Sequence, residues 1–134
     1  MLQTESFAKA IASLERALQE YQREPNEFVL DAGIHRFECT YDLSHKMLKR
    51  HLEMTAANPA ELDGYSFQQL IRTGAEKSLL ANSWNHWSQY RLARNITSHS
   101  YNEARALEVF AQIPAFLLEA QYLLNQLNTK QHDV

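Results

Sequence analysis

Apolar residues recur at three- and four-residue intervals along most of the chain, which is the period of an amphipathic α-helix. The apolar positions of residues 4–23 are Phe7, Ile11, Leu14, Leu18 and Tyr21. Pro25 interrupts this pattern, and the side chain of Asn26 can accept a hydrogen bond from a free amide at the start of a new helix. We therefore expect a first helix over residues 4–23 and a second that begins near residue 27.

Residues 27–55 keep the helical spacing and form the longest predicted helix. A second apolar flank, which includes Ala32, Cys39, Leu43 and Met47, runs beside the first. A helix that is apolar on two sides is typical of burial on two sides. We expect it to pack within its own bundle and against a second subunit.

The rest of the chain predicts three more helices and one clear loop. The loop covers residues 58–65, and Ser66 can cap a helix that continues to about residue 80. A further helix begins near Trp84 and ends near residue 97. Ser100 and Glu103 have the spacing of a capping box, so the last helix is expected over 101–127, kinked at Pro114, with a frayed tail at 130–134.

Composition agrees with an all-α protein, because only three Gly and three Pro are present. With 134 residues, the prediction is one domain over 1–134, an antiparallel up-and-down four-helix-type bundle with an extra short helix. The formal net charge of −3 excludes a polycation that coats nucleic acid, so a nucleic-acid site must be a local basic patch.

One cysteine cannot form a disulfide or a zinc framework within the chain. The N-terminal residues lack the pattern of a signal peptide, and no segment is expected to have the apolar length that crosses a bilayer. The default expectation is a reducing, cytoplasmic setting with no membrane contact.

Residues 94–101 concentrate polar chemistry between ordinary helical segments. Arg94 is a planar donor for phosphate, and His99 is a side chain that exchanges protons near neutral pH. On one continuous helix the two would point about 140° apart, so the predicted helix end between them is what allows a shared pocket, with Asn95 and Tyr101 beside it. An Arg for the charge and a His for the proton suffice for RNA cleavage by the 2′-hydroxyl without a metal.

Other interpretations of the same residues stay open. Arg94 can instead pair with a nearby carboxylate such as Glu103, while His99 only caps a helix. Glu38 can pair with Arg36, shape a cleft, or be solvated.

His35, Glu38 and Asp42 share one helical face, but a carboxylate-bridged metal site needs matching Glu-x-x-His motifs on other helices, so no metal is expected.

Several cationic and aromatic residues are candidates for contact with RNA. The candidate RNA-binding residues are Lys46, Lys49, Arg50 and Arg91. A charged helix end is more often only solvated. Trp84 and Trp87 can stack on bases, although aromatic residues at helical spacing more often belong to a core or an interface. The sequence around His51, His86 and His132 is that of surface histidines.

Two motifs resemble a known group of proteins. Arg94, His99 and Tyr101 spell R-x4-H-x-Y, which resembles the signature of the HEPN-type toxins called HepT. Residues 35–50, HRFECTYDLSHKMLKR, resemble the long-helix signature of the nucleotidyltransferase substrate-binding protein family, a branch of the same group. A Trp commonly stands there at the position of His45, so this departure affects local packing.

The resemblance implies an antiparallel helical bundle that forms a homodimer and needs no cofactor. It implies that Arg94 and His99 carry ribonuclease activity on RNA, with Asn95 orienting the pair. The implied partner is a minimal nucleotidyltransferase, an MntA-like antitoxin, which neutralises the toxin by adding AMP to Tyr101. The alternative is a non-catalytic subunit that binds substrate for the nucleotidyltransferase or activates it.

Overall fold

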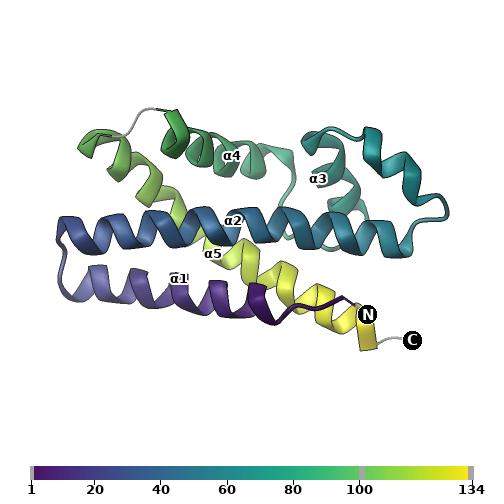
Figure 1. Ribbon diagram of the computed structural model, residues 1–134, viewed down its shortest axis with the longest axis horizontal. Helices are drawn as coiled ribbons and strands as arrows, with labels where there is room; N and C mark the ends of the chain where they lie inside the picture. The colour runs from purple at the N-terminus through teal and green to yellow at the C-terminus, as the bar shows by residue number, and fades with distance from the viewer. Residues whose placement is uncertain (1, 100–101, 133–134) are drawn as a thin grey trace.

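Helices account for the regular structure of this protein, in a computed structural model that describes residues 2–99 and 102–132 (Figure 1). For Ser98, His99, Gln131 and His132 it describes the backbone only. The elements in chain order are α1 (Glu5–Arg23), α2 (Glu27–Thr55), the 3-10 helix η1 (Pro59–Gly64), α3 (Phe67–Glu76), α4 (Trp84–His99) and α5 (Glu103–His132). No strand occurs among these residues, so the predicted all-α class is confirmed.

The long helix α2 lies at the centre and packs against every other element. It runs antiparallel beside α1, and α5 crosses the pair obliquely (Figure 1). The predicted turn at Pro25 and the cap at Asn26 are confirmed, because Asn26 Oδ1 accepts hydrogen bonds from the backbone N–H of Phe28 and Val29, both at 3.0 Å. Capping of this kind satisfies amides that have no partner within the helix.

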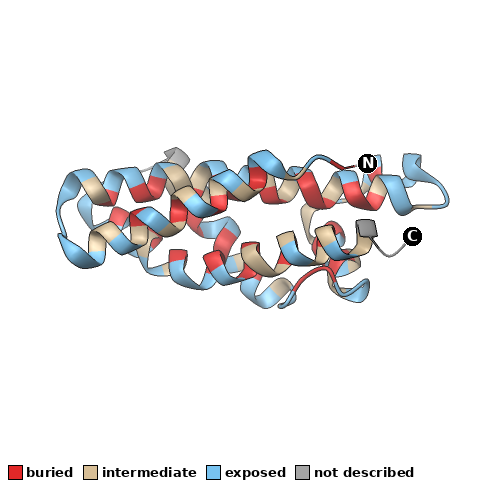
Figure 2. Cartoon of the chain, turned by 90° about the horizontal axis from the view of Figure 1, so that it is seen from below, coloured by how far each residue is buried: buried red, intermediate tan, exposed pale blue. Residues whose placement is uncertain are grey.

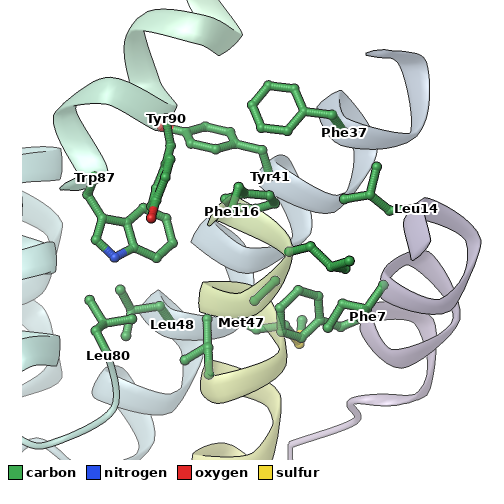
Figure 3. Packing of buried hydrophobic residues seen from close by; sticks show 14 of the residues in the cluster. Phe7, Leu14, Phe37, Tyr41, Met47, Leu48, Leu80, Trp87, Tyr90 and Phe116 are labelled. Atoms are coloured by element: carbon green, nitrogen blue, oxygen red, sulfur yellow. The ribbon is translucent and has the colours of Figure 1, made fainter. Parts of the chain in front are cut away.

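The core is built around aromatic rings from α2, α4 and α5 (Figure 3). Phe116 of α5 lies 5.2 Å from Phe37 and 5.4 Å from Tyr90, centroid to centroid, in edge-to-face geometry. The ring of Trp87 packs at 6.0 Å on the same Phe116. Figure 2 shows buried positions gathered on the faces that the helices turn toward one another. Trp87 therefore belongs to the core, which was one of its two interpretations.

Burial along α2 follows one apolar stripe more closely than the predicted two. Leu30, Ile34 and Phe37 are buried. Of the expected second flank, Met47 is buried and Leu43 is half-buried, whereas Ala32 and Cys39 are exposed. Instead, buried Thr40 and Ser44 extend the inner face; their hydroxyls donate to backbone carbonyl oxygens, as in the bond from Thr40 Oγ1 to the Arg36 carbonyl at 2.7 Å. Packing of α2 on a second subunit stays a prediction.

Two element boundaries in the middle of the chain differ from prediction. The expected loop at 58–65 contains η1. The helix capped by Ser66 does form, with a capping box completed by Gln69, but α3 ends at Glu76, short of residue 80. Ser78 adopts the left-handed conformation with φ 62° and the Leu79 N–H bonds back to the Gly74 carbonyl at 2.9 Å, which ends the helix in a Schellman motif.

The link between α4 and α5 is also placed differently. Helix α4 continues through His99, so the helix end falls after His99 and not between Arg94 and His99. Helix α5 begins at Glu103, and its cap is Asn102, whose Oδ1 accepts from Arg105 N at 2.9 Å. The predicted cap Ser100 lies outside the described residues. At the other end, the tail expected at 130–134 is helical through His132.

Helix α5 corrects two further expectations. Residues Glu103–Lys130 are long enough and apolar enough to cross a bilayer, contrary to the prediction that no segment is. The buried core helix of a soluble protein meets the same criteria of length and composition. The helical spacing of Leu107 with Phe110 and Ile113 predicts that it lies on the apolar side of this helix, but it is 48% exposed. The kink at Pro114 stays a prediction.

A buried carboxylate in α5 anchors the segment that leads into α4. Glu119 accepts hydrogen bonds from the backbone N–H of Ala81 at 2.8 Å and of Asn82 at 3.1 Å. Burial raises the pKa of Glu119, and these hydrogen bonds offset part of the shift. The start of α4, and with it the position of Arg94, is therefore tied to the core.

His51 is buried, contrary to the expectation of a surface histidine. Its pKa is lowered by burial and by the nearby charges of Lys130 and Lys77.

Candidate functional site

Arg94 is held by two carboxylates from the long helix α2. Its Nε and Nη2 donate to the two oxygens of Asp42, each at 3.1 Å, in the two-pronged geometry that a guanidinium and a carboxylate favour. Its Nη1 donates to Glu38 Oε2 at 3.1 Å and to Thr97 Oγ1 at 3.1 Å. We call Glu38, Asp42 and Arg94 the carboxylate clamp.

The clamp fixes both the charge and the direction of the guanidinium. The Arg94 side chain is 23% exposed, and those of Glu38 and Asp42 are 29% and 59% exposed. The hydrogen bonds that Arg94 donates to Asp42 raise the pKa of Arg94, and the charges of Asp42 and Glu38 add to this, against an opposing effect of burial. Arg94 is therefore permanently charged, and with two carboxylates beside it the three groups sum to a local charge of −1.

The clamp resolves the alternatives for these residues. Arg94 does pair with carboxylates, but they are Glu38 and Asp42, not the expected Glu103. Arg36 does not pair with Glu38, because its Nη1 donates to the Ser13 carbonyl at 2.9 Å. Among the described residues no cluster of His, Cys, Asp and Glu could hold a metal ion.

The structure places the other motif residues only in part. Asn95 is exposed on α4, next to Arg94. His99 is the last residue of α4, and its side chain lies outside the described part of the chain, as does the whole of Tyr101. Since residues 94 and 99 share one helix, their Cα–Cβ directions differ by about 140°. A pocket formed by a turn between them, as expected from the sequence, is thus absent.

One of the candidate RNA-binding residues, Arg91, lies over a half-buried aromatic ring, Phe67. The guanidinium carbon of Arg91 lies over this ring at 5.4 Å from its centroid, within the range of a cation–π contact. The imidazole of His45 meets the ring edge-on at 4.8 Å, and Trp84 does so at 5.9 Å. His45 thus packs against an aromatic ring of the neighbouring helix α3.

Charges around His45 are predominantly positive. Its pKa is lowered by burial first, and then by the charges of Lys49 and Arg91, with Asp42 opposing them. The ring is therefore neutral at pH 7, with cations close to it. Lys46 and Arg50 are exposed on α2, and no distance ties them to this group.

Sequence reasoning missed the roles of Asp42, Thr97 and Phe67. Asp42 and Arg94 are separated by 52 residues, and no local pattern joins positions so far apart. Thr97 offered a signal, because a residue three positions after Arg94 lies on the same face of a helix.

The sequence and the structure were compared with known proteins. The family described as nucleotidyltransferase substrate binding protein like matches residues 2–129. A relative in Haemophilus influenzae, named "Probable ribonuclease HepT", is 39% identical over 106 residues, which are 78% of this chain and 72% of the relative.

Two solved structures share the fold. One is a Haemophilus influenzae protein described as having the fold of a substrate binding domain of a nucleotidyltransferase; it matches with a TM-score of 0.87 and 32% identity over 94% of this chain and 99% of that one. A protein of Thermus thermophilus matches with a TM-score of 0.68 and 28% identity, over 90% of this chain and 98% of that one.

Proposed function

Since the chain belongs to the family of nucleotidyltransferase substrate-binding-like proteins, we propose that it is a HepT-like toxin, a metal-independent endoribonuclease whose partner is a minimal nucleotidyltransferase. The observation that carries the proposal is the intact R-x4-H-x-Y motif, Arg94, His99 and Tyr101, in a chain 39% identical to a protein named a probable ribonuclease. The proposed setting is the cytoplasm.

In this reaction the 2′-hydroxyl of the RNA attacks the adjacent phosphorus. His99 takes the hydroxyl proton, the 5′-oxygen leaves with a proton returned to it, and a cyclic phosphate and a 5′-hydroxyl result. Arg94 stabilises the charge on the phosphoryl oxygens of the transition state. Asn95 orients the pair.

The proposed site is shared between two copies of the chain. Within one protomer Arg94 is turned toward α2 by Glu38 and Asp42, while the backbone direction of residue 99 differs from that of residue 94 by about 140°. A second protomer across a two-fold axis offers a His99 to the phosphate that Arg94 holds.

Neutralisation is proposed to occur at Tyr101. Its phenol oxygen attacks the α-phosphorus of ATP in the partner nucleotidyltransferase, pyrophosphate leaves, and an AMP group remains on the tyrosine. The negative charge of the added phosphate would repel RNA from the site.

Incubation of the purified protein with RNA in EDTA tests the nuclease. Wild type should cleave and His99→Ala should not, while His86→Ala, an exposed histidine on the same helix, is the matched control and should cleave as wild type does. Equal background cleavage by wild type and His99→Ala would rule out the nuclease. Mass spectrometry after mixing with the nucleotidyltransferase and ATP should show AMP on Tyr101.

The family description and the fold of the Haemophilus structure favour a second candidate function. In it the protein is a non-catalytic subunit that binds substrate for the nucleotidyltransferase or activates it. This candidate predicts tight complex formation, no toxicity in cells, no AMP on Tyr101, and mutations that change only the activity of the partner.

A further inference from the structure

Acidic residues are missing from two segments that meet where α2 packs on α4. Residues 43–52 and 77–102 contain none of the 16 Asp and Glu residues of the chain, yet they hold six of its 13 Lys and Arg residues. The six are Lys46, Lys49, Arg50, Lys77, Arg91 and Arg94. The rest of the chain therefore has seven cations against all 16 acidic groups. The positive charge of this acidic protein is thus concentrated in two segments of its sequence.

Half-buried aromatic rings lie within this positive region. Phe67 has the Arg91 guanidinium over its face at 5.4 Å and the edges of His45 and Trp84 at 4.8 and 5.9 Å. Trp84 and Phe67 keep contact with solvent, whereas Trp87 is buried. We call His45, Lys49, Phe67, Trp84 and Arg91 the cationic-aromatic patch. Cations interleaved with accessible aromatic faces are the composition of surfaces that bind single-stranded nucleic acid.

The carboxylate that acts on the His45 ring is already paired with Arg94. Asp42 faces His45, but both of its oxygens accept hydrogen bonds from Arg94, and Glu38 accepts a third. The positive charges of Lys49 and Arg91 act together on the His45 ring. An anion that approaches the patch therefore meets the charges of Lys49 and Arg91 beside a carboxylate, Asp42, that is already paired with Arg94.

We propose that the cationic-aromatic patch binds single-stranded RNA, with phosphates on Lys49 and Arg91 and a base stacked on Trp84. A single strand fits because its bases can turn out and stack on aromatic rings or guanidinium planes, while a duplex hides the faces of its bases. The inference rests on the proposed ribonuclease function and adds the surface that takes up the substrate. Arg91 precedes Arg94 by about one helical turn, or about 4.5 Å of rise, so a strand on the patch leads to the carboxylate clamp.

The test uses the full chain and a labelled single-stranded 2′-O-methyl oligoribonucleotide, which cannot be cleaved because the attacking hydroxyl is blocked. The variant Lys49→Gln/Arg91→Gln should bind at least about tenfold more weakly by fluorescence anisotropy. Its plot of log affinity against log salt should be flatter by about 1.4, or about 0.7 for each phosphate contact on a single strand. The matched control is Lys9→Gln/Arg16→Gln, two exposed cations of α1, which should bind within about twofold of wild type. Circular dichroism confirms that all variants are folded.

Tryptophan fluorescence gives a second readout that does not depend on charge. Because Trp87 is buried and Trp84 is half-buried, stacking of a base should quench the emission of Trp84, and the quenching should vanish in Trp84→Phe. Equal affinity of the patch variant and the control variant would overturn the proposal, as would tight binding of a duplex of the same sequence. If the variant Lys49→Gln/Arg91→Gln lost binding to the nucleotidyltransferase but kept its affinity for RNA, the proposal would also be overturned, and the patch would be a protein-docking surface.

The outcome can be separated from that of the nuclease proposal. Oligonucleotide binding on the patch without cleavage of unmodified RNA would leave the patch in place and rule out the nuclease. Cleavage that depends on His99, together with unchanged oligonucleotide binding by the patch variant, would support the nuclease and overturn the patch proposal.

Discussion

Replacing Asp42 by Asn should lower both kinetic constants of RNA cleavage, KM and kcat. Asp42 receives two of the hydrogen bonds of Arg94, both at 3.1 Å, and supplies one of two negative charges in the carboxylate clamp. Asn keeps the shape but has one acceptor oxygen, and its amide group is a donor that faces the guanidinium. The variant therefore loses the two-pronged contact and one charge.

The charge has a calculable effect on substrate binding. A carboxylate about 6 Å from a phosphate repels it by about 0.7 kcal/mol at the dielectric constant of water and by about 3 kcal/mol at an effective value of 20. Removing it should lower KM at least about threefold. The loss of a fixed guanidinium acts on kcat, because misplacement of a catalytic group by about 1 Å can cost up to about a hundredfold. We expect kcat to fall about tenfold. Since Asp42 is 59% exposed, the loss of stability should be only about 0.5–1 kcal/mol.

Steady-state cleavage of a short fluorogenic RNA in EDTA measures both constants. Asp63→Asn, an exposed carboxylate on η1, is the control for net charge and should leave kcat unchanged. If kcat of Asp42→Asn is unchanged or rises, the clamp does not position Arg94 for catalysis, and the reasoning is wrong. A rise would show that the carboxylates restrain the enzyme.

Three further predictions concern stability. Ser78→Gly should raise the free energy of unfolding by about 0.5–1 kcal/mol in thermal melts. The left-handed conformation costs a serine about 1–2 kcal/mol, and glycine adopts it without this cost. The greater conformational freedom of glycine in the unfolded chain offsets part of the gain. Phe116→Ala should lower it by about 3–5 kcal/mol in urea, because the ring is fully buried among four other aromatic rings. Glu119→Ala should lower it by about 2–4 kcal/mol, because the N–H groups of Ala81 and Asn82 lose their acceptor. The pKa of Glu119 is raised in the folded state, so the stability that its protonated form contributes is complete below its unfolded pKa and is lost as pH rises through its folded pKa. Glu119→Gln, which cannot ionise, should therefore gain stability relative to wild type over that rise in pH.

The sequence predicted the helices well where periodicity and capping residues agreed. Helix α2 has the expected bounds, and Asn26 and Ser66 both act as caps. The prediction was wrong where the structure uses residues without a local signal. Helix α3 ends at a left-handed serine instead of a glycine, and Asn102 caps α5 two residues after the Ser that was expected to do so.

The candidate site was predictable as a set of residues and not as a geometry. The motif identified Arg94, but the partners of its guanidinium come from a helix about 50 positions earlier, and long-range pairing of this kind depends on how the helices pack. The expected helix end between residues 94 and 99 is wrong because α4 keeps its hydrogen bonds through His99. The sequence around His51 carried no signal beyond that of a surface histidine, yet the residue is buried.

The hydrogen bond from Thr4 Oγ1 to Asn128 Oδ1, at 2.9 Å, joins positions 124 residues apart. It draws the first residues of the chain against the last turns of α5, so both ends of the chain emerge together, at the opposite end of the bundle from the junction of α4 and α5 (Figure 1). An affinity tag, a fluorophore or a fused nucleotidyltransferase attached at either end would thus extend away from the end of α4 that carries Arg94. A circular permutant with the two ends joined by a short linker and new ends opened at Asn58 should keep the same bundle.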